Sequence, residues 1–218
     1  MARTVFDQEL ERLQQEVLTL GLKVGKALND SVEALKEQDL EAAKKLIASD
    51  AVLNKARFDI ENDTLILIAR HQPMAGDLRL LAAFLEIANE LERIGDYAKG
   101  IAKVTLKIGA QPLIKPLIDI PRMCRKAREM LDGALDSLVR RDAALARSIA
   151  AADDEMDSFY DQIFRELMTY IIKDPRNIDQ ANYLTWVAHN LERAADRVGN
   201  ICERVIFTVT GELIEIDV

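Results

Sequence analysis

A short acidic pattern occurs twice in the chain, 100 positions apart. Leu91-Glu92-Arg93 followed by Asp96 is repeated as Leu191-Glu192-Arg193 followed by Asp196. Repetition at this distance is typical of two copies of one supersecondary unit, so any chemistry that these residues carry is expected twice. Glu and Asp four residues apart lie on one helix face, where like charges repel unless a cation lies between them. The repeat therefore predicts two related halves and two cation sites.

The composition and the breaks between apolar patterns favour an all-α protein. The 218 residues include only nine Gly, five Pro and 5% aromatic residues, whereas 49% are hydrophobic, as is typical of helical proteins. Six segments have helical periodicity and end at Pro, Gly or Asp, namely about 6–37, 39–71, 74–108, 121–140, 142–173 and 178–210. We predict two tandem antiparallel three-helix bundles, in residues 1–110 and 116–218, each with its own core.

Charge and hydropathy argue against several classes of protein. A net charge of -8 makes nucleic acid an unexpected partner. The chain has no run of about 18 apolar residues, so direct membrane insertion is not expected, and its first ten residues lack the pattern of a secretory signal. Cys124 and Cys202 do not have the spacing of metal ligands, which favours reduced cysteines in or beside the core. We therefore expect a cytoplasmic protein.

The repeated acids are predicted to point away from the bundle cores. Apolar residues at 3-4 spacing mark the buried seams of the third and sixth helices, namely Phe84, Ile87, Leu91, Ile94, Ala98 and Ile101, and Leu184, Val187, Leu191, Ala194, Val198 and Ile201. Glu92 and Asp96 lie far from the centre of that seam at about 100° per residue, and so do Glu192 and Asp196. Ferritin-like di-iron proteins direct their carboxylates into the core and add Glu-x-x-His pairs. The pattern thus predicts surface sites.

A second set of polar residues occupies the middle helix of each half. Asp153 and Asp157 are again four residues apart, and alignment of the predicted helix caps matches them with Asp50 and Asn54. Flanks of antiparallel helices can form a groove, and oxygen ligands that converge there suit Mg²⁺, Mn²⁺ or iron. Because the chain has 37 acidic residues, solvated helix faces also account for the spacing. The residues alone therefore leave a metal site and a solvated face as alternatives.

The segments around these acids resemble the PhoU family. Ala88–Asp96 and Asn190–Asp196 resemble the two copies of its signature, and Arg70–Arg79 and Val205–Glu212 match as well. The resemblance implies two three-helix bundles with surface metal clusters of iron, zinc, manganese or magnesium on E(D)xxxD motifs. It implies that the ligands are Asp50, Glu92, Asp96, Asp153, Asp157, Glu192 and Asp196, with Asn54 at a position that is acidic in the family pattern.

The resemblance also implies a non-enzymatic function. PhoU-like proteins are expected to restrain the phosphate-starvation response and to modulate phosphate uptake. They would couple the ATPase of a phosphate ABC transporter to a sensor histidine kinase, act as homodimers and reach the inner membrane face through these partners. The alternative is a metal-dependent oxidoreductase or hydrolase. The sequence contains no Ser-His-Asp set, Walker-type loop or Glu-x-x-His pair to support that alternative.

Overall fold

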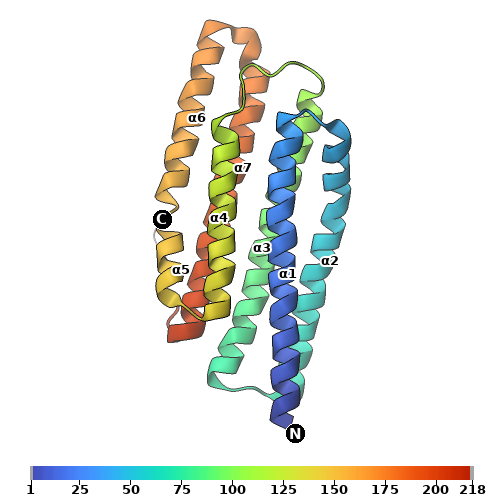
Figure 1. Cartoon of the computed structure of the whole chain (residues 1–218), viewed down its shortest axis with the longest axis vertical. Helices are drawn as coiled ribbons and strands as arrows, with labels where there is room; N and C mark the ends of the chain where they lie inside the picture. The colour runs from blue at the N-terminus through green and yellow to red at the C-terminus, as the bar shows by residue number, and fades with distance from the viewer. Residues whose placement is uncertain (1, 217–218) are drawn as a thin grey trace.

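The computed structural model describes residues 2–216, which fold into an all-α protein. The helices are α1 (Ala2–Lys36), α2 (Leu40–His71), α3 (Ala75–Ile108), α4 (Asp119–Arg140), α5 (Ala143–Ala150), α6 (Asp154–Lys173), the 3₁₀-helix η1 (Pro175–Asn177) and α7 (Ile178–Thr210). Two units, α1–α3 and α4–α7, lie side by side with their helices along the long axis (Figure 1). The predicted fold of six long helical segments in two repeated units is confirmed. Within the described range, no helix has the length and apolarity that a bilayer span requires.

One predicted helix, residues 142–173, is divided in the structure. Tight turns over residues 151–153 separate α5 from α6, with Ala152 N donating to Ile149 O (3.0 Å) and Asp153 N to Ala150 O (3.1 Å). These are i→i−3 bonds, which wind the chain more tightly than an α-helix does. Neither Pro nor Gly lies at this break, so the usual sequence signals for a helix end are absent. Asp153 lies within the turn, and its burial there is described below.

The two halves start their middle helices in the same way. Gln38 and Arg141 both have left-handed backbone conformations, with φ of 52° and 53°. The next residue, Asp39 or Asp142, is an N-cap whose carboxylate accepts two backbone N–H hydrogen bonds of 2.9 and 3.0 Å. Such caps satisfy amide groups that the helix itself cannot satisfy. They also set the register, because Asp50 and Asp153 each follow their cap by 11 residues.

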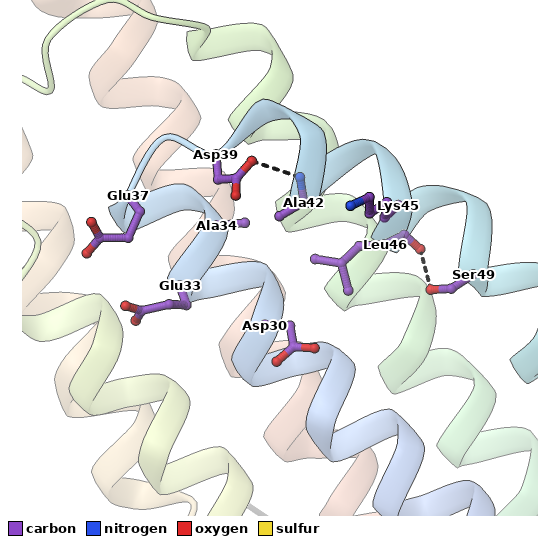
Figure 2. A pocket seen from close by; sticks show the side chains of 9 residues that line it. All are labelled: Asp30, Glu33, Ala34, Glu37, Asp39, Ala42, Lys45, Leu46 and Ser49. Atoms are coloured by element: carbon purple, nitrogen blue, oxygen red, sulfur yellow. Dashed lines mark hydrogen bonds between the residues drawn. The ribbon is translucent and has the colours of Figure 1, made fainter.

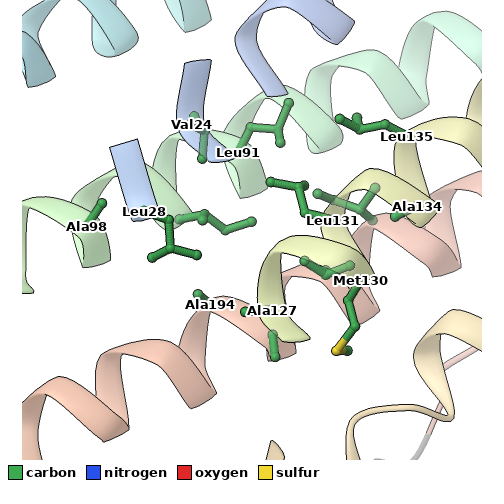
Figure 3. Packing of buried hydrophobic residues seen from close by; sticks show 14 of the residues in the cluster. Val24, Leu28, Leu91, Ala98, Ala127, Met130, Leu131, Ala134, Leu135 and Ala194 are labelled. Carbon is green, nitrogen blue, oxygen red and sulfur yellow. The ribbon is translucent and has the colours of Figure 1, made fainter. Parts of the chain in front are cut away.

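The hydrophobic core extends through both halves, unlike the two separate cores that we expected. Buried side chains from both halves form one contiguous cluster in the described chain. Leu91 and Ala98 of the first half, together with Leu131 and Ala194 of the second, contribute to it (Figure 3). Small residues allow this close approach: a Cβ atom on Gly21 would lie 2.5 Å from a methyl group of Leu135. Periodicity along one helix identifies a buried face but does not show which helix covers it, and so the shared core was not predicted.

Helices α3 and α7 pack against each other in opposite directions and relate the two halves. Glu90 accepts a hydrogen bond from Asn200 Nδ2 (3.1 Å), and Asn190 lies against Gly100. Since positions 90 and 100 correspond to 190 and 200 in the repeat, these are the same contact made twice. A contact of this reciprocal kind is the mark of an approximate twofold axis. Both acidic repeats therefore lie near the middle of the molecule.

The shared core predicts a large stability effect for Leu91. Leu91 is fully buried (0% exposed), and Leu91→Ala should lower the free energy of unfolding by about 2–5 kcal/mol through lost contacts and a residual cavity. Leu22 in α1 is 57% exposed, so Leu22→Ala should change it by less than about 0.5 kcal/mol. Urea unfolding followed by circular dichroism measures both values. Equal losses for the two variants would contradict the assignment of Leu91 to the core.

Candidate metal centres

The predicted ligands of the second half come together where the α5–α6 turn faces α7. We call Asp153, Asp157, Glu192 and Asp196 the second groove. Asp153 is 3% exposed, whereas Asp157 is exposed and the two α7 acids are partly buried. Asp153 Oδ1 is buried and has no hydrogen-bond partner anywhere in residues 2–216. A buried carboxylate oxygen without a partner is costly, and Glu192 Oε2 is a second such oxygen in the site.

The carboxylates of the second groove affect one another electrostatically. Burial raises the pKa of Asp153 to about 7, and the charges of Asp196, Asp157 and Glu192 add to the effect. Burial also raises the pKa of Glu192 and that of Asp196. A cation that bound among these oxygens would relieve both the desolvation and the repulsion. Perturbed groups of this kind are typical of functional sites.

Two other side chains of α7 lie next to Asp196 and Glu192. Arg193 Nη1 donates to Asp196 Oδ2 (2.5 Å). His189 Nδ1 lies 3.2 Å from Glu192 Oε2, but the orientation of the two groups does not allow a hydrogen bond between them. In the part of the chain that the structure describes, no three His, Cys, Asp or Glu side chains are arranged closely enough to hold a metal ion. Metal binding therefore requires Asp196 to leave Arg193 and the carboxylates to move closer together.

The first half has the corresponding residues between α2 and α3, but there a lysine joins them. We call Asp50, Asn54, Glu92 and Asp96 the first groove. Asp50 is 6% exposed, and Lys99 Nζ donates to its Oδ2 at 2.6 Å. The same ammonium group lies 3.6 Å from Asp96 Oδ1. Asn54 Nδ2 also donates to Asp50 Oδ2 (3.3 Å). Asp50 thus has the counter-charge that Asp153 lacks.

A second cation, Arg57, lies beside the first groove. Its guanidinium pairs with Glu61 (2.8 Å) on the same helix. Burial raises the pKa of Glu92, with a contribution from the charge of Asp96, whereas the charge of Arg57 opposes the rise. Neither Lys99 nor Arg57 was predicted to be part of the site. Position-by-position comparison of the two halves could have found Lys99, because the repeat has Gly199 at the equivalent position.

A hollow between α1 and α2 lies apart from both grooves. It encloses about 470 Å³, and its polar lining includes Asp30, Glu33, Glu37, Asp39 and Lys45 (Figure 2). Asp39 caps α2, and Asp30 pairs with Lys26, so these carboxylates already have partners. None of the buried polar atoms that lack a hydrogen bond in the described residues belongs to the lining of this hollow. The hollow contains none of the predicted ligands, and its groups are typical of a solvated surface.

The two cysteines are core residues, as predicted. Cys124 and Cys202 are both buried and free. Burial raises the pKa of each thiol to about 12. Since the thiolate is the form that binds metal and attacks electrophiles, neither cysteine is suited to bind metal at neutral pH. Any metal site in the described chain must therefore use oxygen or imidazole ligands.

The fold and these grooves define a class of protein: an all-α protein of two equivalent three-helix units, each with a groove of polar oxygen ligands. A family model described as the PhoU domain matches the chain twice, over residues 17–105 and 120–205. The chain belongs to the PhoU family.

Named relatives and a solved structure agree with this assignment over nearly the whole chain. The phosphate-specific transport system accessory protein PhoU homolog of Aquifex aeolicus is 36% identical over 208 residues, which are 95% of this chain and 94% of that protein. The Escherichia coli K12 protein PhoU is 35% identical over 95% of this chain and 86% of its own length. The crystal structure of the phosphate transport system regulatory protein PhoU from Streptococcus pneumoniae has a TM-score of 0.90 and 32% identity and covers 97% of this chain and all (100%) of that one.

The two grooves differ in how well they fit the metal clusters that the family resemblance implies. The second groove offers four carboxylates, of which Asp153 is buried with an oxygen that lacks a partner in residues 2–216. Such hard oxygen ligands suit magnesium, manganese or iron. In the first groove, Asp50 has Lys99 as its counter-ion. The residues of the second groove therefore fit a metal ion once Asp196 leaves Arg193, whereas those of the first do not while Lys99 holds Asp50.

Proposed function

We propose that this protein restrains the phosphate-starvation response and modulates phosphate uptake. It does so in the cytoplasm, by coupling the ATPase of a phosphate ABC transporter to a sensor histidine kinase. Relatives matched over 95% of the chain are named accessory proteins of the phosphate-specific transport system, which supports the link to transport. The regulatory role is favoured over a metal-dependent oxidoreductase or hydrolase because the similar solved structure is named a regulatory protein.

The proposal includes a metal ion of the divalent or trivalent type, such as iron, manganese, magnesium or zinc, in the second groove. The observation that carries this part is the buried carboxylate of Asp153, with its unpartnered oxygen in the described chain and the charges of Asp157, Glu192 and Asp196 around it. These residues would hold the ion. When bound, the ion supplies positive charge that offsets the repulsion between the carboxylates and can attract an acidic group of a partner.

The two similar halves suggest how one chain engages more than one partner. A regulator changes the balance between two states of its target only if it binds one state more tightly than the other. The approximate twofold symmetry gives two related surfaces, and the unequal grooves make these surfaces chemically different. One surface can therefore contact the transporter ATPase while the other contacts the kinase or a second copy of the chain in a homodimer.

This proposal predicts that the protein reaches the membrane through its partners. Cells that produce the transporter and the kinase should show the protein in the membrane fraction, and cells without both should show it in the cytosol. The reason is electrostatic, since a chain of net charge -8 is repelled by anionic lipid and gains little from binding it directly. Fractionation and immunoblotting measure the distribution.

Lipid vesicles provide the control for membrane recruitment. In chelator, the purified protein should remain in solution when it is mixed with protein-free phosphatidylglycerol vesicles. Tight binding to these vesicles would show that lipid alone recruits the protein. An unchanged distribution in cells that lack both the transporter and the kinase would contradict the proposed partners.

A further inference from the structure

One difference between the two grooves is a lysine that only the first groove has. Lys99 follows the acidic repeat of α3, and Gly199 occupies the same place after the repeat of α7. Gly199 has no side chain, and a Cβ atom there would meet no atom within 4 Å among the described residues outside its own helix turn. The first half therefore supplies a cation from within the chain, whereas the second half leaves room at the equivalent position.

The ammonium group of Lys99 takes the position that a bound cation would need. It bridges the two walls of the first groove, at 2.6 Å from Asp50 Oδ2 on α2 and 3.6 Å from Asp96 Oδ1 on α3. Because Asp50 is almost fully buried, its charge requires a counter-charge close by. A metal ion and this ammonium group cannot bind the same carboxylate oxygen at the same time without strong repulsion.

The side chains around the two grooves also differ in charge. Arg57 on α2 lowers the negative potential at Glu92, whereas the position that matches it on α6 is Tyr160. Asp157 takes the place of Asn54, which adds a carboxylate to the second groove. In the second groove, Arg193 contacts Asp196, while Asp153 Oδ1 has no hydrogen-bond partner in the described chain. The residues at positions 157 and 160 and the unpartnered oxygen of Asp153 make the second groove more favourable for a cation, whereas the Arg193 contact opposes metal binding at Asp196.

We propose that Lys99 replaces a metal ion in the first groove, so that the chain binds metal through the second groove only. This inference rests on the proposed metal binding of the second groove. Removal of the Lys99 side chain should open the first groove to metal, because Asp50, Glu92, Asp96 and the amide oxygen of Asn54 remain as oxygen ligands. The two halves of the fold would then have equivalent metal sites.

The test measures manganese bound by the purified full-length chain, using equilibrium dialysis and elemental analysis. The wild type should bind manganese, and Glu192→Gln with Asp196→Asn should abolish this binding. Lys99→Ala alone should raise the bound manganese about twofold, because both halves then have a site. In the background without the second groove, Lys99→Ala should restore binding. Lys103→Ala, at an exposed position one turn along α3, is the matched control and should change nothing.

A stability measurement gives a second result that does not depend on the amount of metal bound. In chelator, Lys99→Ala should lower the melting temperature, because Asp50 loses its counter-ion, and manganese should raise that temperature again. Lys99→Arg should bind no additional metal and should melt close to the wild type. Lys103→Ala should show neither effect.

The outcomes separate this inference from the metal binding on which it rests. If the variant without second-groove carboxylates still bound manganese and lost it on Glu92→Gln, the first groove would bind metal beside Lys99. That result would overturn the inference and leave a metal-binding protein. If Lys99→Ala gained no manganese in either background, the inference would also be overturned. A wild type that bound no manganese in the second groove would contradict the proposed function instead.

Discussion

Asp153→Asn should stabilise the protein at pH 8 by about 2 kcal/mol in chelator, and it should have little effect at pH 5. Burial and the neighbouring carboxylates raise the pKa of Asp153 to about 7 in the folded protein. At pH 8 the folded state therefore contains a buried anion that the unfolded chain would expose to water. Asn has nearly the same shape and carries no charge, so it removes this cost. Water near the groove screens part of the repulsion, which limits the gain to about 2 kcal/mol.

The direction of the pH dependence follows from the number of bound protons. Between the ordinary pKa of an aspartate, about 4, and the folded value of about 7, the folded state holds a proton on Asp153 that the unfolded state has lost. Stability therefore falls as pH rises through this range. At pH 5 Asp153 is mostly protonated in the folded protein and resembles Asn. The raised pKa values of Glu192 and Asp196 act in the same direction.

Urea unfolding at the two pH values measures the effect of Asp153→Asn. Asp161→Asn is the matched control, because Asp161 lies on α6, the helix that begins directly after Asp153, but is exposed and pairs only with the nearby surface residue Arg165 (3.1 Å) among the described contacts. It should change the stability by less than about 1 kcal/mol at either pH. If Asp153→Asn destabilised the protein at pH 8, the ionised carboxylate would be well satisfied in the fold. The metal proposal would then lose its main support.

The same substitution should lower the affinity of the second groove for metal. A residue that is costly to the fold yet useful for binding is a common compromise at functional sites, where stability and function oppose each other. The buried carboxylate of Asp50 does not carry the same cost, because Lys99 of the same chain neutralises it. The two halves thus place a buried acid at equivalent positions, but only the first half gives that acid a counter-ion within the chain.

Much of this fold could be predicted because its signals are local. The apolar seams of α3 and α7, such as Ile87 and Val187, are buried as their spacing predicted, and the Asp39 cap begins the next helix. The burial of Asp153 could not be predicted, because the turn that contains it has no Pro or Gly. The role of Lys99 was also missed, since its partner Asp50 is 49 positions away and the contact depends on how α2 packs on α3.

Deletion of the gene should switch on the phosphate-starvation response in phosphate-rich medium and deregulate phosphate uptake. The regulator is proposed to favour the inactive state of the kinase, so its loss returns the kinase to its own balance between states. Coupling energies of about 1–3 kcal/mol correspond to changes of roughly 5- to 150-fold. The activity of a reporter fused to a starvation-induced promoter should increase by roughly 5- to 150-fold. Uptake of labelled phosphate measures the second effect.

Complementation of the deletion strain tests whether the second groove contributes to regulation. The wild-type gene and the Asp161→Asn control should both restore repression, whereas Asp153→Asn combined with Glu192→Gln should restore only part of it. Because these substitutions remove charge repulsion from the groove, the variant protein should remain folded, and immunoblotting and circular dichroism check this. Full repression by the groove variant would show that regulation does not need this site. If the deletion strain itself repressed its starvation genes normally in rich phosphate, the regulatory function proposed for this protein would be wrong.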